Sequence, residues 1–154
     1  MLLTNKYTYS IIRLIEKGMG KMRLWHYKLI PVLPKDMLVS QWRECIAIKR
    51  QWEKGTLKHR LVSYVMDDKE LFMNYVDKVL HEMDRRKIKY QYKYYYEIKD
   101  FCNPNHFKTG HHYKEHNDRY LKQCYYNLQE KYDRGIITKE EWQKIEDLFK
   151  SEVD

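Results

Sequence analysis

Apolar residues recur every three or four positions along most of the chain, and this spacing predicts helices rather than strands. The clearest stripe lies within Asp67–Arg86. Its apolar members are Leu71, Phe72, Tyr75, Val76, Val79, Leu80 and Met83. Asp67, followed three positions later by Glu70, is a typical helix start, and basic residues at the other end suit a helix C-terminus. We therefore predict a long amphipathic helix over this range.

Weaker stripes predict further helices at Lys35–Trp52, Lys58–Met66 and Tyr113–Tyr132, and from Thr138 onward. Gly135 suits a stop after the third of these, and Thr138 with Glu141 forms a capping box for the last. The stretch Tyr90–Gly110 shows no clear period and is predicted to be irregular. The pattern as a whole predicts an all-α protein, a single compact domain of about four to five helices.

Composition narrows the class of protein. No apolar run reaches the roughly 20 residues that span a bilayer, and no secretory signal precedes the helices. The three cysteines, Cys45, Cys102 and Cys124, are scattered and odd in number, which favours buried thiols in a reducing compartment. We therefore expect a cytoplasmic protein without a membrane partner.

The formal net charge of +8 and pI near 9.2 point to an anionic partner, with nucleic acid first and an anionic membrane surface second. The positive charge has two competing explanations: a low-GC genome, which enriches lysine and tyrosine, and a role in solubility only.

Three motifs could carry chemistry, and each has a plainer explanation. Arg43-Glu44 borders the predicted apolar face and could supply an acid or base, although such pairs are usually solvated. Tyr90–Lys99 interleaves aromatic and basic residues, as surfaces that stack bases do, but also as a connector packed on the core would. A cluster of histidines, His111, His112 and His116, could bind a metal, but lacks a recognised ligand pattern.

The stretches "MRLWH" and "LIPVLP", followed by "LVSQWREC", resemble the pyrimidine-dimer DNA glycosylase (endonuclease V) family. The likeness is to its small bacterial branch, whose members commonly begin MRLWH, and it covers Met22 to Asp133. It implies an all-α fold in which an N-terminal segment threads between helices. It also implies attack of a free α-amine on C1′ of a damaged nucleotide, an imine intermediate, and β-elimination at the abasic site.

Carried over by position, the resemblance assigns catalytic roles to Met22, as the amine, and Glu44, as acid/base and imine stabiliser. It assigns contacts with DNA to Arg23, Arg43, His26, Lys58, His59 and His116. No metal and no organic cofactor is implied, and the expected partner is damaged double-stranded DNA bound by a monomer. One departure is Ala47, where the family carries an arginine one turn after the Arg-Glu pair.

An internal residue has no α-amine, so this mechanism requires Met22 to be the first residue. We expect residues 1–21 to be a non-native or disordered extension and residues 22–154 to form the helical domain. The alternative function is a non-catalytic nucleic-acid-binding protein that keeps the fold. A metal-dependent enzyme built on the histidine cluster is the third possibility.

Overall fold

The computed structural model describes residues 22–103 and 111–153. The predicted N-terminal extension, residues 1–21, lies outside these ranges, so that boundary stays a prediction. The helical elements are η1 (Tyr27–Val32), α2 (Lys35–Lys54), η2 (Arg60–Asp67), α3 (Lys69–Arg85), α4 (Tyr92–Cys102), α5 (Asp118–Asp133) and α6 (Lys139–Val153). Every regular element of the described ranges is a helix, which confirms the predicted all-α class.

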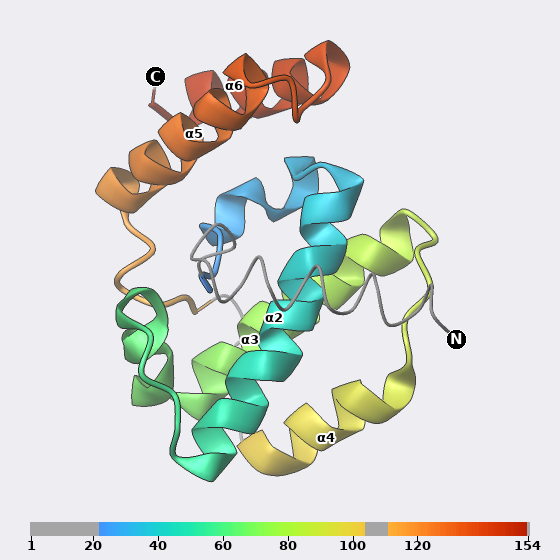
Figure 1. Ribbon diagram of the computed structural model, residues 1–154, viewed down its shortest axis with the longest axis vertical. Coiled ribbons are helices and arrows are strands. Elements are labelled where there is room, and N and C mark those ends of the chain that lie inside the picture. Colours follow the sequence, from blue (N-terminus) through green and yellow to red (C-terminus); the bar gives the residue numbers. More distant parts are fainter. Residues whose placement is uncertain (1–21, 104–110, 154) are drawn as a thin grey trace.

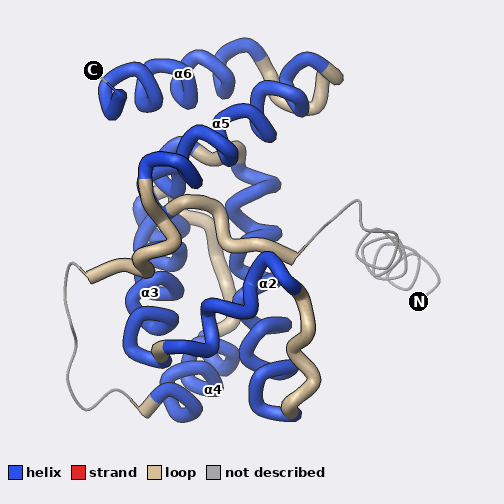
Figure 2. Tube along the Cα trace, turned by 90° about the vertical axis from the view of Figure 1, so that its left-hand side faces the viewer, coloured by secondary structure: helices blue, strands red, loops and turns tan. Residues whose placement is uncertain are grey.

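The helices form one body around a shared core. Helices α2, α3 and α4 contact one another, and η1 packs on both α3 and α6. Figures 1 and 2 show α5 and α6 as a pair at one end of the molecule and α4 at the other end. Because η1 contacts both α3 and α6, the segment Met22–His26 that leads into η1 lies close to both groups of helices.

The two long central helices lie almost where the apolar stripes predicted. Helix α2 ends at Gly55, whose positive φ of 72° suits a residue without a side chain. Helix α3 begins one residue later than predicted, because Asp68 and not Asp67 is its cap. The Asp68 carboxylate accepts hydrogen bonds from the backbone N–H groups of Glu70 and Leu71, at 2.9 and 3.1 Å.

The prediction of an irregular Tyr90–Gly110 segment is wrong for Tyr92–Cys102, which forms helix α4. Ile98 and Cys102 lie four residues apart and are both buried, at 0% and 6% exposure. Burial of this short apolar face stabilises a helix that its many tyrosines do not favour on their own. Asn103 ends the helix in the left-handed region, at φ 40°. Residues 104–110 lie outside the described ranges.

Helix α5 begins five residues later than predicted. The Asn117 side chain caps it by accepting a hydrogen bond from the N–H of Tyr120 at 2.9 Å. The capping box of α6 is confirmed in both directions: the N–H of Thr138 donates to Glu141 at 2.9 Å, and the N–H of Glu141 donates to the Thr138 hydroxyl at 3.2 Å.

The three cysteines are buried in the structure, as predicted. Cys45, Cys102 and Cys124 are all buried free thiols. In the two described ranges, no helix has the length and apolar character needed to cross a membrane.

Candidate active site

The segment Met22–His26 lies against three helices that are distant from one another in sequence. All of its residues except Arg23 are buried. The Tyr75 hydroxyl, from α3, donates to the backbone oxygen of Trp25 at 2.6 Å. The Tyr120 hydroxyl, from α5, donates to the backbone oxygen of Leu24 at 2.5 Å. These bonds satisfy backbone groups that no regular secondary structure pairs, and they fix the path of the segment.

Gln41 of α2 joins this segment to the predicted catalytic carboxylate. Its Oε1 accepts the N–H of Trp25 at 2.7 Å, and its Nε2 donates to the backbone oxygen of Arg23 at 2.9 Å. The same Nε2 lies 3.3 Å from Oε2 of Glu44. Gln41 is 1% exposed, so its polar groups depend on these partners. Sequence reasoning missed this residue, although a glutamine beside an apolar helical stripe is a usable signal.

Glu44 points toward the start of the described chain. Its Oε2 accepts the backbone N–H of Arg23 at 3.4 Å, one residue beyond Met22. Burial raises the pKa of Glu44 to about 7, although the bond from Arg23 and its positive charge act in the opposite direction. The carboxyl group therefore exists in both protonation states near neutral pH, which suits a group that takes up and releases a proton.

The basic residues near Glu44 in sequence or in space differ in how exposed they are. Arg23 is half-buried, and its guanidinium lies over the Trp25 ring at 4.8 Å from the centroid. Arg43 is exposed. Lys131, from α5, was not predicted: it is half-buried, and its charge acts on Glu44. Burial, followed by the nearby charge of Arg23, lowers the pKa of Lys131. The positive charges that act on Glu44 therefore come from Arg23, in the segment before η1, and from Lys131 of α5.

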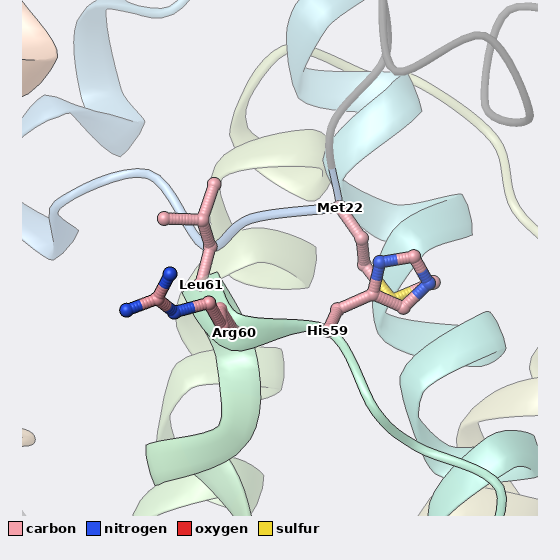
Figure 3. A pocket seen from close by; sticks show the side chains of 4 residues that line it. All are labelled: Met22, His59, Arg60 and Leu61. Carbon is pink, nitrogen blue, oxygen red and sulfur yellow. The ribbon is translucent and has the colours of Figure 1, made fainter.

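A cavity of about 600 Å³ adjoins Met22. His59, Arg60 and Leu61 line it from the start of η2 (Figure 3). In this view the His59 ring lies beside the Met22 side chain, whereas the Arg60 guanidinium points away from both. Lys58 and His59 are exposed, so both predicted residues belong to an accessible basic segment next to Met22.

His26 and His116 have a different environment from the one predicted. They are 1% and 6% exposed. Nδ1 of His116 accepts the N–H of Tyr27 at 3.2 Å, so Nε2 carries the proton and faces the Tyr64 hydroxyl oxygen at 2.7 Å. Nδ1 of His26 accepts the N–H of Lys28 at 3.2 Å. Both rings accept hydrogen bonds from backbone N–H groups inside the fold. Their burial argues against the predicted direct contacts with DNA.

We expect acid to destabilise the fold through these two imidazoles. Burial lowers the pKa of His26 to about 4 and that of His116 to about 3, from an ordinary value of 6.5. As the pH falls below 6.5, the unfolded chain binds protons that the folded chain does not, so the free energy of unfolding decreases down to about pH 3. Urea denaturation at pH 7.5 and pH 4.5 measures the loss. His116→Asn should show a smaller loss, and an equal loss in that variant would contradict the assignment.

The histidine cluster does not form the helical pair that a metal site would need. His112 precedes α5 and stacks on the Tyr27 ring, with centroids 3.5 Å apart, while His116 faces Tyr64. In residues 22–103 and 111–153, no three side chains of the His, Cys, Asp or Glu types are placed to hold a metal ion.

Comparison with known proteins adds one finding. The family model described as pyrimidine dimer DNA glycosylase matches residues 22–96. Comparisons with curated proteins and with solved structures give no match. The matched range begins at Met22 and includes Gln41, Glu44 and the basic segment at the start of η2. Over residues 22–96, just under half of its length, the chain is similar to the pyrimidine dimer DNA glycosylase family.

Proposed function

We propose that the protein is a DNA glycosylase and AP lyase that acts on damaged duplex DNA through the α-amine of Met22. The observation that carries the proposal is the hydrogen bond of 3.4 Å from the N–H of Arg23 to Glu44. It places a carboxyl group with a raised pKa one residue from the proposed nucleophile. The family match, which starts at the same methionine, supports the same class of reaction.

The chemistry suits an α-amine better than a lysine. An ordinary α-amine has a pKa of about 7.7–8.0, against about 10.4 for lysine, so a usable fraction is neutral at pH 7. The nitrogen lone pair attacks C1′ of the damaged nucleotide, and the bond to the base breaks with the electron pair leaving on the base. The attached nitrogen then loses a proton, its lone pair forms the C1′=N bond of the protonated imine, and the C1′–O4′ bond breaks as O4′ takes up a proton. Loss of a C2′ proton then expels the 3′ phosphate by β-elimination.

Glu44 serves two steps in this scheme. As a carboxylate it accepts a proton and stabilises the positive imine nitrogen, and as an acid it returns a proton to a leaving oxygen. Arg23, Arg43, Lys58 and His59 are the proposed phosphate contacts, because they are half-exposed or exposed and lie close in sequence to Met22, to Glu44 or to the cavity lining. His26 and His116 are left out of this interface because they are buried.

Borohydride trapping tests the proposal. A protein that begins at Met22 should form a covalent adduct with abasic or pyrimidine-dimer DNA when the imine is reduced. The 154-residue chain, in which Met22 is joined to Lys21 by a peptide bond, should form none as long as it stays intact. Lack of an adduct with the Met22-first protein, at a concentration that saturates the DNA, would overturn the proposal. It would favour the non-catalytic nucleic-acid-binding alternative, which the net charge of +8 supports.

The proposed phosphate contacts have a measurable salt dependence. Each contact that is lost should reduce the slope of log K against log salt by about 0.9. We therefore expect Arg43→Ala and Lys58→Ala to weaken binding to duplex DNA and to flatten this slope. Fluorescence anisotropy at several salt concentrations measures it, with Lys144→Ala, an exposed cation of α6, as the matched control. Equal slopes in all three variants would place the DNA elsewhere.

A further inference from the structure

A second cavity, of about 320 Å³, lies between the C-terminal half of α3 and the start of α4. Its volume is at the lower end of the range for small-ligand pockets. Tyrosines and aspartates dominate its lining: Tyr90, Tyr92, Tyr95, Tyr96, Asp77 and Asp84. Four of these six belong to the tyrosine-rich motif that the proposed DNA chemistry does not use.

The tyrosine rings meet at steep angles. The Tyr90 and Tyr92 rings have centroids 5.3 Å apart and an interplanar angle of 71°. The Tyr95 and Tyr96 rings have centroids 5.5 Å apart and an angle of 66°. The two rings of each pair therefore lie in different planes at the edge of the cavity. Tyr92 and Tyr96 are 65% and 55% exposed, so a ligand can reach these rings from solvent.

The charge of this cavity is opposite to that of the whole chain. Its described lining has two carboxyl groups and neither lysine nor arginine, although the chain carries a formal net charge of +8. Tyrosine hydroxyls donate to both carboxylates: Tyr90 to Asp84 at 3.2 Å, and Tyr95 to Asp77. Lys99 is the cation that acts on Asp77. Asp84 is exposed and faces the cavity, so its charge is open to a ligand.

We propose that this cavity binds a small organic ammonium cation, with a methylated ammonium group held against the tyrosine faces. The negative face of an aromatic ring attracts such a cation, and several rings in different orientations surround it better than one. The carboxylate of Asp84 adds a charge of the right sign at the edge. This binding does not depend on the proposed glycosylase activity, because neither Met22 nor Glu44 is among the residues that line this cavity.

A titration with choline chloride tests the proposal on the full chain, with 3,3-dimethyl-1-butanol as the uncharged analogue of the same shape. Amide signals of residues 77–96 in ¹⁵N-correlated NMR spectra should shift and saturate with choline. Sodium chloride at the same ionic strength serves as the blank. We expect the uncharged analogue to bind at least about tenfold more weakly, which corresponds to the upper part of the range for cation–π attraction.

Two variants locate the binding. Tyr92→Leu and Asp84→Asn should each weaken choline binding by about three- to thirtyfold. Tyr126→Leu removes a tyrosine of similar exposure, 59%, from α5 and should leave binding unchanged. Circular dichroism checks that the variants fold. The proposal is overturned by any of three results: no saturable shift with choline, equal binding of the uncharged analogue, or unchanged binding in Tyr92→Leu.

Discussion

Glu44→Gln is expected to lower kcat of the Met22-first protein on damaged DNA by about 10²- to 10⁴-fold, the usual contribution of a positioned acid or base. Glutamine has nearly the same shape, and its oxygen can still accept the N–H of Arg23. It cannot move a proton or balance the positive charge of the imine. The substitution therefore separates chemistry from architecture, because the hydrogen bond survives and the titrating group does not.

The same variant has a predicted effect on stability. The pKa of Glu44 is about 7 in the folded protein and near 4.5 when the chain is unfolded. Between these values the folded state binds the extra proton, so this group lowers the free energy of unfolding as the pH rises from 4.5 through 7. Glu44→Gln should remove that decrease.

Single-turnover cleavage and urea denaturation at pH 5 and pH 8 measure the two effects. The control is Glu140→Gln, an exposed glutamate of α6, which should leave activity unchanged and change the free energy of unfolding by no more than about 1 kcal/mol. A Glu44→Gln protein with full activity would show that the carboxylate takes no part in the reaction.

Gln41→Leu is expected to reduce the free energy of unfolding by about 2–5 kcal/mol. Leucine is of similar size but leaves the N–H of Trp25 and the backbone oxygen of Arg23 without their partners. A buried polar group that loses its hydrogen bond costs about 1–3 kcal/mol. Activity should fall further than stability alone explains, mainly in kcat, because the segment that carries the nucleophile is no longer fixed relative to Glu44.

Urea denaturation at pH 7 gives the stability change, and multiple-turnover cleavage of saturating DNA, below the unfolding range, gives kcat. Gln123→Leu, at an exposed position of α5, is the control. If Gln41→Leu unfolds at the same urea concentration as the parent protein, the hydrogen bonds assigned to Gln41 do not anchor the segment.

Long helices with a clear apolar stripe were predictable because their burial pattern repeats with the helical period. This holds for α3 and for α2, whose boundaries differ from the predicted ones by one or two residues. Helix α4 was missed because only Ile98 and Cys102 of its residues are fully buried, too few to show a period. The start of α5 was misplaced because Tyr113 is buried by the fold around it and not as part of a helix.

In the candidate site, only the residues whose type is itself typical of catalysis or binding could be predicted from the sequence. Arg43-Glu44 stood out as a charged pair, and the family resemblance gave Met22 and Glu44 their roles. Gln41 and Lys131 did not stand out, because their importance arises from contacts between distant parts of the chain. His26 and His116 show the opposite case, since both were predicted to contact DNA from their residue type and position and both are buried within the fold.

The most direct measurement of the central claim is mass spectrometry of the borohydride-trapped adduct after proteolysis. With the protein that begins at Met22, the reduced sugar should be attached to the N-terminal peptide, at the α-amine of Met22. Prior reductive methylation of that amine to the tertiary form should abolish the adduct. A sugar attached to a lysine side chain instead, such as that of Lys131, would contradict the account.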